Sequence, residues 1–155
     1  MKKGFSLILF LLFTISVNAQ SNYIPEISPV DVYGNLEEIG FTTEKDLGSR
    51  FGNFWTSTNS SNGIKYTVEV SSDNVNKVES IRATVQNFYR NEQEATQFFK
   101  YVGSALFLYN NRDKSNFDRW VTNNFNKDAT TSVGSVSIEI DAPSKTIRIL
   151  KISAN

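Results

Sequence analysis

The chain has 155 residues with 16 Lys and Arg against 16 Asp and Glu, and it contains neither histidine nor cysteine. Without imidazole or thiol groups it cannot form Ser-His-Asp or Cys-His nucleophile systems or ordinary zinc and copper sites, so we predict no catalytic residues, no metal and no cofactor. The balanced charge, with no basic stripe along the sequence, indicates that nucleic acid is not a partner.

Residues 1–19 have the layout of a secretory signal peptide. Lys2 and Lys3 precede an apolar run over residues 5–17, and small residues follow before Gln20. We predict cleavage after Ala19 and a secreted or periplasmic protein. The run is shorter than the about 20 residues that span a bilayer, so the mature form is expected not to be embedded in a membrane, an uncleaved anchor being the alternative. Removal of the two lysines leaves 14 basic and 16 acidic residues, a net charge of −2.

The rest of the chain is predicted to form one domain. Residues 20–27 are interpreted as an N-terminal tether, and residues 28–155 as a single domain large enough for its own core. Because no disulfide can support this domain, its stability has to come from apolar packing. The 12 Phe, 6 Tyr and 2 Trp of the full chain make such packing feasible.

The first element expected in the domain is a helix over about residues 29–39. Ser28 suits the N-cap, Pro29 suits the first helical position, and Gly40 supplies a left-handed stop. Gly34 lies inside this segment. It either weakens the helix by about 1 kcal/mol relative to alanine or marks the close approach of another element.

Three strands are expected next, joined as an antiparallel meander. Apolar and polar residues alternate over residues 64–70 and again over residues 81–85. The pair Asn62-Gly63 favours the positive φ angles of a tight hairpin, which makes residues 51–57 the preceding strand. A polar turn at residues 72–77 connects the second strand to the third.

Two helices follow the meander. Ser115-Asn116-Phe117-Asp118 resembles a capping box and is predicted to start the second of them, which ends in an Asn-rich run. The first is the most periodic segment of the chain. Its apolar stripe consists of Ala95, Phe98, Phe99, Val102, Ala105 and Leu106.

A closing hairpin completes the predicted order. Residues 136–140 alternate in polarity, residues 141–144 contain a turn signal, and residues 146–152 return as a strand. The expected fold is therefore α+β, with a mostly antiparallel five-stranded sheet, about three helices packed on one face, and the order α-β-β-β-α-α-β-β.

The polar faces of these strands supply the candidate binding surface. Three helices on one face of the sheet would leave the other face open. We therefore favour a non-catalytic binding or interaction domain that recognises a protein or a glycan through the open face. A homodimer formed through the sheet is a lesser version of this hypothesis. The candidate binding residues are Trp55, Lys65, Thr67, Glu69, Arg82, Thr84, Glu139 and Arg148.

Trp55 belongs to this set because it follows Phe54 directly on an expected strand. Consecutive strand residues face opposite ways, so one of the two rings leaves the core side of the sheet. An exposed aromatic ring on a polar sheet gives a binding surface area at small entropic cost. The alternative is that Trp55 and Trp120 both belong to the core.

A carboxylate-dependent hydrolase acting on glycans is the alternative hypothesis for the whole chain. Glu69 and Glu139 are the only pair that we nominate for it, because both are expected on polar strand faces. Such catalysis needs two carboxyl groups about 5–10 Å apart. A solvated face with cross-strand ion pairs is the structural alternative for these two residues.

Overall fold

The computed structural model of the protein describes residues 22–89, 91–107 and 110–155. The predicted signal peptide and its cleavage site lie outside the described residues. The elements in chain order are α1 (Pro29–Glu38), β1 (Thr42–Ser49), β2 (Gly52–Ser61), β3 (Ile64–Ser72), β4 (Ser80–Gln86), α2 (Glu92–Ser104), α3 (Asn111–Asn124), β5 (Ala129–Val133), β6 (Val136–Ser144) and β7 (Ile147–Ala154).

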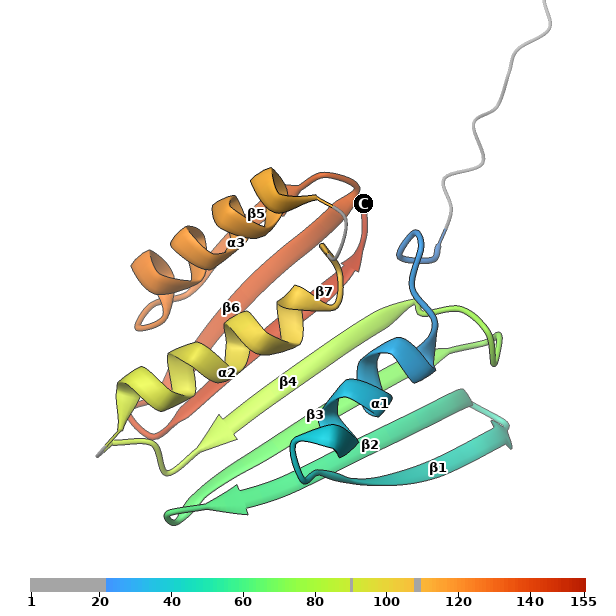
Figure 1. The fold of residues 1–155 in the computed structure, drawn as a ribbon, viewed down its shortest axis with the longest axis horizontal. Helices are drawn as coiled ribbons and strands as arrows, with labels where there is room; N and C mark the ends of the chain where they lie inside the picture. Colours follow the sequence, from blue (N-terminus) through green and yellow to red (C-terminus); the bar gives the residue numbers. More distant parts are fainter. Residues whose placement is uncertain (1–21, 90, 108–109) are drawn as a thin grey trace, which may run out of the picture.

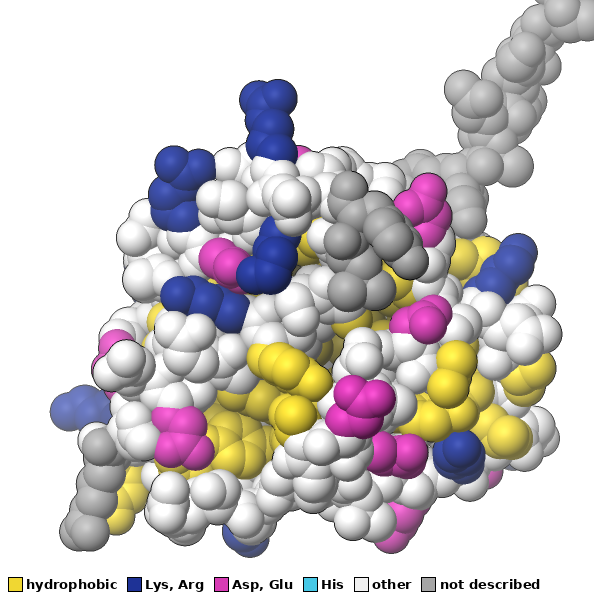
Figure 2. Space-filling model, viewed as in Figure 1, with side chains coloured by type: hydrophobic (Ala, Val, Ile, Leu, Met, Phe, Trp, Pro, Cys, Tyr) yellow, Lys and Arg dark blue, Asp and Glu magenta, His cyan; other side chains and the backbone are white. Residues whose placement is uncertain are grey.

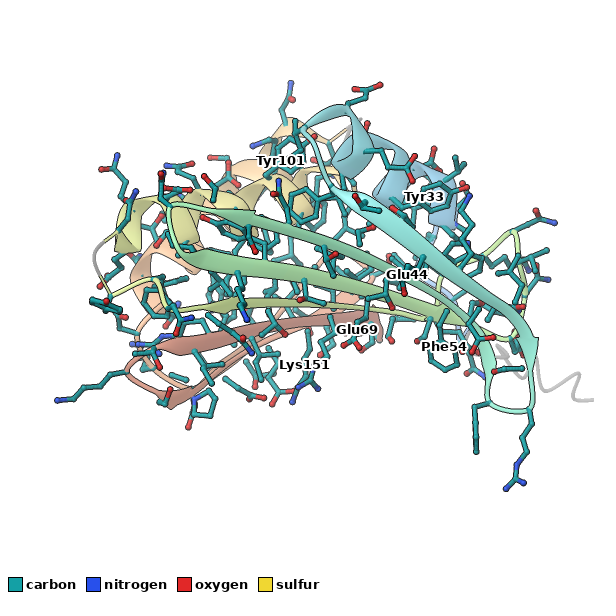
Figure 3. The ribbon with its side chains drawn as sticks, turned by 90° about the horizontal axis from the view of Figure 1, so that it is seen from below. Tyr33, Glu44, Phe54, Glu69, Tyr101 and Lys151 are labelled. Carbon is teal, nitrogen blue, oxygen red and sulfur yellow. The ribbon has the colours of Figure 1, made fainter. Side chains whose placement is uncertain are left out.

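All seven of these strands form one antiparallel sheet with the order β1-β2-β3-β4-β7-β6-β5. The meander β1–β4 and the three strands β5–β7 meet where β4 pairs with β7 (Figure 1). The helices α1, α2 and α3 lie side by side on one face of the sheet (Figure 1), and the edge-on view in Figure 3 shows that the described chain leaves the opposite face uncovered.

The prediction of a five-stranded sheet is wrong, although the α+β class is correct. The two strands that the sequence analysis missed, β1 and β5, are the two edges of the sheet. No residue of β1 is buried, and in β5 only Val133 is. An edge strand with so little buried surface does not need alternating apolar residues, so its sequence lacks the period-two pattern.

Two predicted boundaries also differ from the structure. Helix α3 begins at Asn111, because the side chain of Asn110 accepts a hydrogen bond from the backbone N–H of Asp113 at 3.1 Å and caps the helix there. Asn is as good an N-cap as Ser, so Ser115 lies within the helix. The expected turn at residues 141–144 belongs to β6, which pairs with β7 as far as Ser144.

The tight hairpin between β2 and β3 is confirmed. Ser61 pairs with Ile64, so the loop has two residues, and both Asn62 and Gly63 have positive φ angles of 52° and 80°. This is the type I′ geometry that Asn-Gly favours.

The core lies between the helices and the covered face of the sheet. Five of the six residues of the expected apolar stripe are buried, and the sixth, Leu106, which follows the end of α2, is partly buried. Ile24 and Ile27, in the segment interpreted as a tether, are buried as well, and Ile24 forms an isolated bridge with Val78. The largest fully buried side chains are Phe99, Phe117, Phe125, Leu36, Ile81, Ile138, Ile140, Leu150 and Ile152.

Candidate functional site

The face of the sheet that no described helix covers carries its side chains in rows that cross the strands. Residues directly opposite each other in antiparallel strands lie on the same face, so the pairing registers define these rows. The central row contains Glu44, Thr56, Glu69, Arg82, Lys151, Glu139 and Thr130. On one side of it lie Ser71, Ser80, Ser153, Ser137 and Ser132, and on the other Thr42, Thr58, Thr67 and Thr84.

Ion pairs involve four of the five charged side chains of the central row, together with the neighbouring Asp141. Arg82 Nε lies 3.6 Å from Glu69 Oε2. Lys151 Nζ lies 2.7 Å from Asp141 Oδ2 and 3.4 Å from Glu139 Oε1. The hydrogen bond between Lys151 and Asp141 lowers the pKa of Asp141 and raises the pKa of Lys151. Because these side chains are partly exposed, each ion pair fixes the orientation of its side chains but contributes little to the stability of the fold.

This open face is acidic. Its strands place Glu44, Asp46, Glu69, Glu139 and Asp141 on it, against Lys65, Arg82 and Lys151, which gives five negative and three positive groups, a net charge of −2. Within the described part of the chain, neither Glu44 nor Asp46 takes part in an ion pair. The excess negative charge is therefore concentrated toward the β1 edge.

The structure brings six of the eight candidate residues together on the open face. They are Lys65, Thr67, Glu69, Arg82, Thr84 and Glu139. Figure 3 shows Glu69 and Lys151 on this side of the sheet, away from Tyr101 and the helices.

Trp55 and Arg148 lie on the covered face instead. Trp55 is 3% exposed and belongs to the core, whereas its neighbour Phe54 is directed to the open face. Arg148 is 6% exposed. In β7, Arg148 has the same parity as Leu150 and Ile152, and the structure buries that face of the strand.

Buried hydrogen bonds hold the Arg148 guanidinium on the helix side. Its Nε donates to the carbonyl oxygen of Phe125 at 2.7 Å, and its Nη2 donates to Asn126 Oδ1 at 2.9 Å. Its Nη1 donates to the carbonyl oxygens of Ser144 and Ile147. The guanidinium also lies 5.0 Å from the centroid of the Phe88 ring. Arg148 therefore joins the end of α3 to the β6–β7 turn and has no role on the open face.

The spacing of Glu69 and Glu139 does not favour a hydrolytic pair. Glu69 is on β3 and Glu139 is on β6, and both β4 and β7 lie between them. Three spacings of about 4.8 Å separate these strands, which places the two residues about 14 Å apart. Retaining and inverting glycosidases hold their carboxyl groups about 5–9.5 Å apart. Each glutamate also has a cationic partner of its own.

A cavity that no sequence pattern predicted lies between the end of α1 and helix α2, on the helix side of the sheet. Its volume is about 370 Å³, and its lining includes Ile39, Phe41, Phe98 and Tyr101. Figure 2 shows hydrophobic side chains exposed on this side of the molecule. Four separate segments of the chain contribute to this cavity, so no local pattern in the sequence could indicate it.

Tyr66 and Glu94 meet in the same cavity. The Tyr66 hydroxyl donates a 2.7 Å hydrogen bond to Glu94 Oε1. Burial, together with this hydrogen bond and the charge of Glu94, raises the pKa of Tyr66 well above its ordinary value. The folded protein therefore keeps the phenolic proton at a pH where an exposed tyrosine loses it.

Alkaline pH should destabilise the protein through Tyr66. Because the pKa of Tyr66 is higher in the folded than in the unfolded state, its contribution is complete below about pH 10 and is lost as the pH rises above that value. We expect the free energy of unfolding to fall above about pH 10, and Tyr66→Phe to reduce this fall. Urea unfolding followed by circular dichroism between pH 8 and pH 11.5 measures both. An equal fall in the two proteins would contradict the assignment.

The described residues place two further limits on the site. They contain no cluster of three or more acidic side chains arranged to hold a metal ion. Among the same residues, no helix has the length and apolar character needed to cross a membrane.

Comparisons of the sequence with known protein families, and of the chain with curated proteins and solved structures, found no match.

Proposed function

We propose that this chain is a non-catalytic binding domain that recognises a protein through the open face of its sheet. We further propose that it acts in the periplasm or the medium, as the signal-peptide layout of residues 1–19 predicts. One observation carries the proposal on the site. All three described helices pack on one face, which leaves a broad polar face with a charged central row facing solvent (Figures 1 and 3).

The charge of the open face indicates the chemistry of the partner. A surface with a net charge of −2 attracts Lys and Arg side chains, and electrostatic complementarity of this kind speeds association and selects partners. The flanking serine and threonine rows add hydroxyl groups that can donate or accept hydrogen bonds. The proposed partner is therefore a protein with a cationic, hydrogen-bonding surface.

The scarcity of aromatic rings on this face favours a protein over a glycan. Phe54 is the only aromatic side chain that the described strands direct to the open face, and it is partly buried. With Trp55 in the core, the ring that would have provided a flat stacking surface is absent from the face.

A titration with a defined cationic probe tests the proposal. The isotope-labelled protein is titrated with an oligolysine peptide, and backbone amide shifts are followed by NMR. We expect shifts centred on the β1–β3 part of the open face. Replacing two of its acids, Glu44→Gln with Glu69→Gln, should raise the Kd for the peptide at least about threefold at low salt.

The matched control removes two charges from the helix side. Glu37 and Glu38 are both exposed on α1, so Glu37→Gln with Glu38→Gln changes the net charge by the same amount. This control should bind oligolysine as the parent protein does. Equal weakening in both variants, or shifts centred on the helices, would overturn the proposal. Tighter binding of a neutral oligosaccharide at the same face would replace the protein partner with a glycan.

A further inference from the structure

The two edges of the sheet are protected differently against pairing with another strand. β1 carries Glu44, Lys45 and Asp46 in succession and has a register irregularity before Ser49, both of which discourage strand addition. β5 contains no charged residue over its five positions. Alternate residues of an edge strand direct their backbone N–H and C=O groups away from the sheet. β5 therefore presents hydrogen-bonding groups that an extended chain can pair with.

A groove lies beside this unprotected edge. Helix α3 and strand β5 form a cavity of about 450 Å³, lined by Asn116, Arg119 and Trp120 from the helix and by Thr131 and Val133 from the strand. Trp120 is partly buried against the core and contributes apolar surface. A strand added to β5 would direct alternate side chains toward the helix side of the sheet, and these side chains would enter the groove.

The groove also contains a cationic group. Arg119 lines it and donates from Nη2 to Asn116 Oδ1 at 2.8 Å, which orients the guanidinium. Asp113 is the acidic residue among the described residues that line the groove. Its Oδ2 accepts a 2.8 Å hydrogen bond from Asn110 Nδ2 at the start of α3. Asp118 is paired with Lys114 at 2.6 Å. Figure 2 shows several Lys and Arg side chains over α3, in the upper left of the view.

We propose that β5 and α3 form a second binding site, which takes an extended peptide carrying a carboxylate side chain as an additional strand of the sheet. The peptide backbone pairs with β5. A carboxylate on the groove side meets Arg119, and a neighbouring apolar side chain packs on Trp120. This site lies on a different surface from the open face, and the inference does not depend on the proposed function.

The charge of α3 disfavours a second copy of the chain as the occupant. If two copies paired β5 with β5 about a two-fold axis, the helix-covered faces of both sheets would lie on the same side. The two α3 helices would then lie side by side. Arg112 and Arg119 are seven positions apart and share one side of α3. The same cationic groups of both copies would then approach each other, whereas an acidic peptide would neutralise them.

Peptide binding tests this inference directly. The probe is a fluorescently labelled eight-residue peptide of alternating Thr and Val with one central Glu, and binding is followed by fluorescence anisotropy. N-methylation of one set of alternate peptide amides should abolish binding, and methylation of the other set should preserve it, because only alternate amides of an added strand face β5. Equal binding of both methylated peptides would overturn the proposal.

Two substitutions locate the peptide on the protein. Arg119→Gln should raise the Kd for the Glu peptide at least about tenfold and leave the Kd for a Gln version of the peptide unchanged. Arg50→Gln, at the exposed connection between β1 and β2, is the matched control and should change neither value. Equal effects of the two substitutions would contradict the location. A dimer by light scattering that the peptide does not dissociate would assign the edge to a second copy.

Discussion

Replacing Gly103 by alanine should destabilise the protein by about 2–4 kcal/mol, because the core has no room for the added methyl group. A Cβ atom at Gly103 would lie 2.0 Å from Cε1 and 2.2 Å from Cζ of Phe117. Phe117 is fully buried and packs against Phe107, so its ring cannot move aside without displacing α2 from α3. Urea unfolding followed by circular dichroism measures the effect.

The same substitution at Gly34 is the matched control and should have the opposite sign. Gly34 is in α1, and the nearest atom to its added Cβ is Val30 Cγ2 at 3.8 Å, an ordinary contact. Alanine is preferred to glycine inside a helix by about 0.8–1 kcal/mol, so Gly34→Ala should stabilise the protein by up to this amount. A gain in stability for Gly103→Ala would show that α2 and α3 are packed less closely than described.

Replacing Arg148 by methionine should cost about 1.5–3 kcal/mol, since it removes hydrogen bonds made by a charged group and leaves the buried carbonyl oxygen of Phe125 without its donor. The carbonyl oxygen of Phe125 and the side chain of Asn126 would each lose a donor. Arg148 is 6% exposed, and this burial lowers its pKa. The melting temperature and the urea midpoint should both fall.

Arg82→Met is the control for Arg148→Met. The Arg82 side chain is 47% exposed, and its ion pair with Glu69 has a 3.6 Å separation. Exposed pairs of this kind contribute about 0–1 kcal/mol, so the substitution should leave stability nearly unchanged. Similar losses for Arg82→Met and Arg148→Met would contradict the structural role assigned to Arg148.

The central strands of the sheet could be predicted because their burial follows their sequence. In β3 the apolar Ile64 and Val68 alternate with the polar Lys65 and Thr67, and the structure buries the first pair and leaves the second at the surface. Each of these strands has neighbours on both sides and helices on one face. Their side chains are therefore divided into a buried set and a solvent-facing set, and apolar and polar residues alternate along the sequence in the same way.

The orientation of β2 could not be predicted, because polar residues share the buried face with Trp55. Asn53 and Ser57 are 6% and 1% exposed. Asn53 Nδ2 donates to the carbonyl oxygen of Ser72, and the Ser57 hydroxyl forms a 2.8 Å hydrogen bond with that of Thr43. Since local hydrogen bonds satisfy these groups, they can be buried without the apolar alternation that a sequence analysis depends on.

The location of Arg148 was a different kind of error. Isoleucines at 147 and 149 and the apolar pair Leu150 and Ile152 have opposite parity, so either face of β7 could be read as the apolar one. The structure buries the face that contains Arg148. The burial is feasible because the backbone carbonyl groups of Phe125, which is 23 residues away in the chain, and of Ser144 in the β6–β7 hairpin accept its hydrogen bonds.

The position of β7 in the middle of the sheet affects how the chain folds during synthesis. β7 follows every other strand in chain order, yet it pairs with β4 on one side and β6 on the other. A chain synthesised only as far as the sixth strand has produced two pieces of sheet, β1–β4 and β5–β6, without the strand that pairs with both. Folding to completion must wait for Ile147–Ala154, and until then the nascent chain remains open to chaperones.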